Sequence, residues 1–166
     1  MARRPPADVH EKLIEDIGRA MLQATVQANL GKYKEGVMQR WLGKWSEHTF
    51  AVLRVVSGAL FACHGAQKLF GVLGGRQNLQ DPLVLTAGII ELVGGLLIAL
   101  GLFASFAAFL ASGEMAVAYF KVHAPNGFWP ILNKGELAVV YCFLFLYIAA
   151  RGSGPFSLDR LRGAKR

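Results

Sequence analysis

Long apolar runs separated by short polar loops dominate the chain between residues 49 and 150. The runs cover residues 49–70, 83–120 and 135–150, and the loops cover residues 71–82 and 122–134. A helix needs about 20 apolar residues to cross the ~30 Å hydrocarbon core of a bilayer. The middle run is too long for one such helix, so it predicts two helices joined by a tight turn near Gly101 to Ser105. The pattern therefore predicts an all-α fold, a transmembrane four-helix bundle.

The first 48 residues follow a different pattern, that of an amphipathic helix. Apolar side chains recur there at spacings of three and four, namely Val9, Leu13, Ile17, Met21, Ala24 and Ala28. A second short helical piece is expected to contain Trp41 and Trp45, and tryptophan commonly anchors helices at a membrane surface. We expect three parts, a cytoplasmic or interfacial amphipathic extension over residues 1–48, the bundle over 49–151 and a basic cytoplasmic tail over 152–166.

Composition and charge support a membrane protein. Hydrophobic residues make up 54% of the 166 residues and charged residues only 17%, which is unusual for a soluble domain. Of the 18 Lys and Arg residues, eight lie in residues 1–50 and five in residues 151–166, and they form no basic face interleaved with aromatics, so no nucleic-acid partner is expected. Because Lys and Arg concentrate on the cytoplasmic side of membrane proteins, we expect a multi-pass protein with both termini in the cytoplasm.

A few ionisable residues lie inside the apolar runs, where charge is costly. One charge at the bilayer centre costs about 2.5–3.5 kcal/mol on insertion scales, so such residues face a bundle interior and mark a functional region. Glu91 and Glu114 fall on helix faces that are rich in Gly and Ala. Arg54 lies near the cytoplasmic end and is expected to pair helices. The predicted site is an outward-opening cavity lined by His64, Gln67, Lys68, Glu91, Glu114, His123 and Glu136, with Trp129 at the same end.

Four segments of the apolar region resemble the DoxX family. They are residues 61–71 (FACHGAQKLFG), residues 91–103 (ELVGGLLIALGLF), Glu114-Met115, and residues 123–136 with their Gly-Phe-Trp and Gly-Glu pieces. The resemblance covers about residues 50–160 and implies a four-helix integral membrane protein of prokaryotic cytoplasmic (inner) membranes. It also implies a link to quinone-reducing or thiol-related redox systems, so the chain would be at most a subunit of a membrane oxidoreductase. Whether the chain is itself an enzyme stays open.

The polar residues allow several chemistries. A quinone needs an apolar slot, a hydrogen-bond donor for its carbonyl oxygen and a carboxylate relay for protons. A metal site is not predicted, because the imidazoles and carboxylates come from separate helices and loops without a Glu-x-x-His pair. A haem would depend on His64 alone. The candidates for the proton relay are Glu91, Glu114 and Glu136, and those for ligand binding are His64, Gln67, Lys68, His123 and Trp129.

A structural role competes with this chemistry, since Lys68, Arg54 and the glutamates would also pair simply to hold the helices in register. Cys63 and Cys142 are isolated in different spans, so a dithiol centre within this chain is not expected. We expect an accessory subunit of a quinone- or electron-transfer-linked complex, with quinone the one cofactor that the residues suggest. It would contact the bilayer, and other membrane subunits through residues 8–48 and the bundle faces. The alternatives are a non-catalytic scaffold that anchors partner proteins and, less favoured without inverted repeats, a small transporter.

Overall fold

The structure is a computed structural model, and it describes residues 7–34 and 37–163. Over these residues every regular element is a helix and no strand is present, which confirms the predicted all-α class. The chain divides into two compact units, residues 1–45 and residues 46–166.

The first unit consists of helix α1 (Ala7–Lys34), helix α2 (Val37–Leu42) and the 3-10 turn η1 (Gly43–Trp45). Helix α1 has 28 residues and extends beyond the apolar positions from Val9 to Ala28 that predict it. Its large apolar side chains, such as Ile14 and Met21, are exposed, as are Trp41 and Trp45. The surface of this unit therefore offers apolar side chains to a membrane or a partner.

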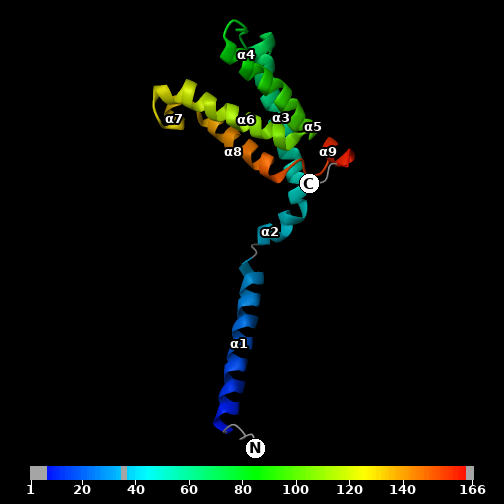
Figure 1. The fold of residues 1–166 in the computed structure, drawn as a ribbon, viewed down its shortest axis with the longest axis vertical. Coiled ribbons are helices and arrows are strands. Elements are labelled where there is room, and N and C mark those ends of the chain that lie inside the picture. Colours follow the sequence, from blue (N-terminus) through cyan, green and yellow to red (C-terminus); the bar gives the residue numbers. More distant parts are fainter. Residues whose placement is uncertain (1–6, 35–36, 164–166) are drawn as a thin grey trace, which may run out of the picture. The chain divides into compact units, whose positions relative to one another are not determined.

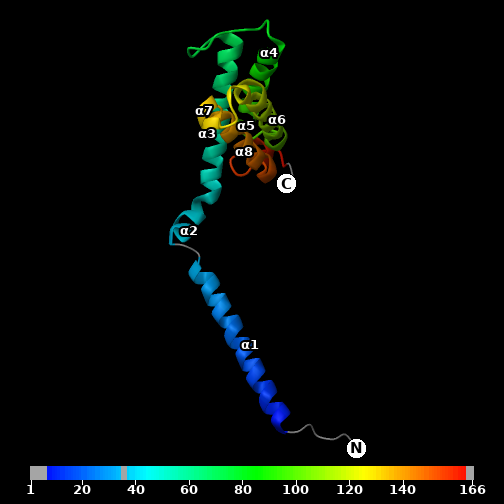
Figure 2. The same cartoon turned by 90° about the vertical axis from the view of Figure 1, so that its left-hand side faces the viewer.

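The second unit contains the predicted spans (Figure 1). Its elements are α3 (Ser46–Phe70), α4 (Pro82–Ile89), η2 (Ile90–Gly94), α5 (Gly95–Leu100), α6 (Ala104–Ala118), η3 (Tyr119–His123), η4 (Ala124–Asn126), α7 (Pro130–Asn133), α8 (Glu136–Arg151) and α9 (Leu158–Leu161). The elements η2 and η3 are π-helical turns, and α4, η2 and α5 follow one another as one helix. Figure 2 shows the loop of residues 71–81 that joins α3 to α4, at the end of this unit opposite residues 152–161.

Two pairings build this unit. Helix α3 packs along α4, η2 and α5, while α6 lies beside α8 (Figure 1), and α5 contacts α6. Between α6 and α8, the Ser112 hydroxyl donates a hydrogen bond of 2.8 Å to the Cys142 carbonyl oxygen. At the centre, the Phe61 ring on α3 contacts the Phe145 ring on α8 with their centroids 4.7 Å apart. The core therefore joins α3 to α8.

Glycines allow the backbone of α3 to contact the backbone of the α4–η2–α5 helix directly. A Cβ atom placed on Gly65 would meet the Leu92 backbone nitrogen and lie 2.7 Å from the Gly88 carbonyl oxygen. A Cβ atom on Gly95 would lie 2.5 Å from the Ala62 nitrogen. Small residues allow this close approach of membrane helices.

Substituting Gly65 with alanine is expected to destabilise the bundle by about 2 kcal/mol, because backbone atoms cannot yield to the added methyl group as a side chain would. Gly113 on α6 is the matched control, since its Cβ would meet nothing within 4 Å. Thermal unfolding of the purified protein measures both. A Gly65→Ala variant as stable as Gly113→Ala would contradict the close packing of α3 on η2.

Two helices in the described part of the chain are long and apolar enough to cross a membrane, Gln39–Phe70 and Pro82–Leu100. Helix α8 has 16 residues, which at 1.5 Å per residue cover about 24 Å, less than a typical ~30 Å hydrocarbon core.

The turn between α5 and α6 lies where the sequence predicts it. Gly101 has a φ of 66°, and α6 begins at Ala104. The first N–H groups of α6 are capped from far along the chain, because the Asp159 carboxylate accepts hydrogen bonds from the Phe103 and Ala104 nitrogens at 3.0 and 3.3 Å. Burial alone would raise the pKa of Asp159. The two backbone hydrogen bonds and a third from the Ser153 hydroxyl have the larger effect, so the pKa lies below its ordinary value. Residues 152–161, here the C-terminal segment, are thereby tied to the turn.

Candidate functional site

A partly buried ion pair joins α3 to the π-helical turn η2. The Lys68 ammonium, in the last turn of α3, donates to Oε1 of Glu91. The Glu91 side chain is only 3% exposed, whereas that of Lys68 is 35% exposed. A π turn inserts an extra residue into a helix and changes the direction of its side chains, and such turns are frequent at functional sites. Here the turn carries Glu91 itself, so a local irregularity of the helix coincides with its one buried charge.

Glu114 on α6 adds a second carboxyl group to this pair. It is half-buried, and both Glu91 and Lys68 act on it electrostatically. The Oε2 atoms of Glu91 and Glu114 are buried and have no hydrogen-bond partner among the described residues. One ammonium group therefore faces two carboxyl groups, and uptake of one proton would leave the cluster neutral. Lys68, Glu91 and Glu114 are called the charged cluster below.

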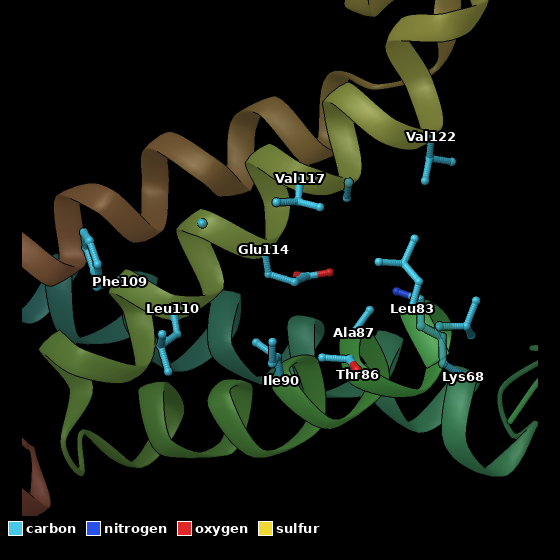
Figure 3. A pocket seen from close by; sticks show the side chains of 13 residues that line it. Lys68, Leu83, Thr86, Ala87, Ile90, Phe109, Leu110, Glu114, Val117 and Val122 are labelled. Carbon is cyan, nitrogen blue, oxygen red and sulfur yellow. The ribbon is translucent and has the colours of Figure 1, made fainter. Parts of the chain in front are cut away.

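A pocket of about 540 Å³ lies between α4 and α6, and two members of the charged cluster, Lys68 and Glu114, form part of its wall. Lys68 and Glu114 are its only charged lining residues, and Thr86 adds a hydroxyl group. Figure 3 shows the Glu114 carboxyl group pointing from α6 into the space between the two helices. The apolar part of the wall includes Leu83, Ala87 and Ile90 on one side and Leu110, Val117 and Val122 on the other. The pocket is thus an apolar slot with a charged patch.

The structure divides the remaining predicted site residues among separate places. His64 Nδ1 lies 3.2 Å from the Gln67 side-chain oxygen, and the Gln67 amide nitrogen donates a hydrogen bond of 2.9 Å to the Leu73 carbonyl oxygen. This pair therefore holds the loop that follows α3 in place. His123 Nδ1 lies 3.2 Å from the Asn133 carbonyl oxygen, an acceptor, so this nitrogen carries the proton. None of these side chains lines the pocket.

Glu136 and Trp129 are exposed and also lie outside the pocket lining. Of the seven residues expected around one cavity, the structure brings together Lys68, Glu91 and Glu114. Thr86 and the apolar wall of α4 were not singled out from the sequence. The same apolar residue types face lipid, the protein core or a pocket in a membrane helix, so residue type does not show which residues line the pocket.

Arg54 makes no ion pair with a glutamate in the described part of the chain. It lies about four turns before Lys68 on α3, roughly 20 Å away along the helix, and it is completely buried. Its guanidinium group donates to the carbonyl oxygens of Ser153, Pro155 and Phe156, at 3.4 Å for Pro155 and 2.8 Å for Phe156. Arg54 therefore fastens the C-terminal segment to α3 instead of joining two spans through a carboxylate.

Among the described residues, no group of three or more His, Cys, Asp and Glu side chains is arranged to hold a metal ion. Cys63 and Cys142 are both free thiols, the first exposed and the second half-buried.

The described residues are all helical, and they include two helices apolar enough to cross a bilayer and an ion pair between those helices, a combination that is typical of a helical membrane protein. A family model named DoxX matches residues 49–124. An uncharacterized protein of Haemophilus influenzae is 44% identical over 125 residues, which cover 71% of this chain and 93% of that protein. The chain therefore belongs to the DoxX family, as the four sequence segments predict. No solved structure matches it.

Proposed function

We propose that this protein is an accessory subunit of a quinone- or electron-transfer-linked membrane complex, and that the pocket between α4 and α6 receives the quinone. The observation that carries the proposal is the composition of the pocket wall, which is apolar except for Lys68, Glu114 and Thr86. Small-molecule sites commonly combine an apolar wall with a few polar groups that fix orientation. A lipid-soluble ring with two carbonyl oxygens fits that combination.

The residues of the charged cluster have distinct proposed roles. Lys68 donates a hydrogen bond from its ammonium group to a carbonyl oxygen of the ligand, and Glu91 holds that ammonium group in position through their ion pair. Glu114 points into the pocket and exchanges a proton there. Reduction of a quinone to a quinol consumes two electrons and two protons, and a redox subunit of the complex supplies the electrons. This chain contributes the slot and a proton route.

The membrane topology is part of the proposal. We infer that α3, the α4–η2–α5 helix, the α6–η3 helix and α8 form four spans in a prokaryotic inner membrane, with both termini cytoplasmic. The two apolar helices and the Lys and Arg at the chain ends support this arrangement. A helix as short as α8 is accommodated by local thinning of the bilayer or by flanking side chains that reach the interface.

Purification of the full chain from its native membrane in mild detergent tests the proposed function. We expect quinone in the lipid extract, in proportion to the protein, and redox subunits among the proteins that co-purify. A quinone-free preparation bound to a complex without redox subunits would contradict the proposal and favour the scaffold role, in which α1 and the bundle faces anchor partner proteins.

A further inference from the structure

A second groove lies beside the C-terminal segment, away from the charged cluster. Its volume is about 700 Å³. Val55 on α3 and Leu100 on α5 form one wall, and Phe156, Leu158 and Leu161 of the C-terminal segment form the other. Val55 and Leu100 belong to the two helices that are long and apolar enough to cross a membrane. The groove therefore adjoins helices that are apolar enough to face lipid.

Arg160 is the charged residue among those that line this apolar groove in the described part of the chain. Arg160 lines it, is exposed, and makes no side-chain hydrogen bond or ion pair with the residues that the structure describes. The nearby arginines Arg151 and Arg162 make contacts with other residues. Arg151 donates to Glu47 and to the Tyr147 hydroxyl, and Arg162 lies over the Phe103 ring, 5.4 Å from its centroid.

Asp159, next to Arg160, is also engaged, because its two oxygens accept hydrogen bonds from Ser153 and from the start of α6. Residues 151–166 contain five Lys and Arg and this one acidic residue, so the end of the chain attracts anions. Basic pockets at the membrane boundary are typical binding sites for anionic lipid head groups.

We propose that this groove binds an anionic phospholipid, with the phosphate at the Arg160 guanidinium group and an acyl chain along Val55, Leu100 and Phe156. Charge complementarity selects the head group, and the apolar wall on two candidate spans selects the chain. Guanidinium groups are well suited to phosphate because they present several donors in one plane. The site shares no lining residue with the pocket between α4 and α6, so it stands or falls independently of quinone binding.

Native mass spectrometry of the delipidated full chain tests the proposal, with dioleoylphosphatidylglycerol and dioleoylphosphatidylcholine titrated separately. We expect the anionic lipid to bind about fivefold more tightly, the effect of one Arg near a lipid phosphate. Arg160→Gln is expected to remove this preference. Arg76→Gln, which makes the same charge change in the exposed loop after α3, is expected to keep it.

A second variant tests the apolar wall. Val55 is 45% exposed, so Val55→Trp fills the groove without disturbing the core and is expected to weaken binding of both lipids. Thermal unfolding of each variant confirms that it is folded. Equal affinity of the native chain for the two lipids, or an equal effect of Arg160→Gln and Arg76→Gln, would overturn the proposal.

Discussion

Replacing Lys68 with methionine is expected to destabilise the protein by about 3 kcal/mol and to abolish binding of a quinone in the pocket between α4 and α6. The loss arises because Glu91 would keep a buried carboxyl group without its cation, while Glu114 adds a second carboxyl group nearby. The thermal unfolding of the purified protein measures the first effect, and binding of a fluorescent quinone analogue measures the second.

Two controls make this prediction specific. Lys121→Met removes an exposed lysine from η3 and should change stability by less than about 0.5 kcal/mol. Adding Glu91→Gln to Lys68→Met removes the unpaired charge and should recover part of the stability, but not the binding. A Lys68→Met variant with native stability would show that the ion pair has no structural weight, and unchanged binding would remove Lys68 from the site.

An Arg54→Ala variant is expected to lose about 4 kcal/mol of stability and to release the C-terminal segment. Arg54 is completely buried, and its removal leaves the Ser153, Pro155 and Phe156 carbonyl oxygens without their donor and opens a cavity on α3. Limited proteolysis should therefore cut after Arg160 much faster than in the native chain, and the melting temperature should fall.

Arg151 supplies the comparison for Arg54, because it also lies near the end of the bundle but makes a partly exposed ion pair with Glu47. Such pairs contribute about 0–1 kcal/mol, so Arg151→Ala should have a small effect. If Arg54→Ala were as mild as Arg151→Ala and its C-terminal segment as resistant to protease, the fastening role of Arg54 would be wrong.

Much of the helix packing was predictable from the spacing of small residues. Gly88, Glu91 and Gly95 recur at three and four residues, and the structure buries all three against α3. Periodicity works here because the face of a helix that carries glycines is the face that its neighbour can approach. The tight turn at Gly101 was predictable for a related reason, since a run too long for one helix must reverse where the backbone can adopt a positive φ.

The candidate site was predictable only in part. Depth along the spans groups His64 with Lys68 and Glu91, but depth does not determine which way a side chain points around its helix. The π turn at residues 90–94 also changes the direction in which the Glu91 side chain points, and no residue pattern predicts this turn. For Arg54 the partners are backbone carbonyl oxygens, which every residue has, so the sequence contains no signal for that contact.

The central claim is that a quinone occupies the pocket between α4 and α6, and photoaffinity labelling with an azidoquinone in native membranes tests it most directly. Leu110→Trp fills the pocket, and Leu146→Trp is the matched control, because Leu146 has nearly the same exposure, 44% against 45%, and does not line the pocket. We expect label on peptides from α4 and α6, displaced by unlabelled quinone, lost in Leu110→Trp and kept in Leu146→Trp. Label that is absent, or that persists unchanged in Leu110→Trp, would contradict the claim.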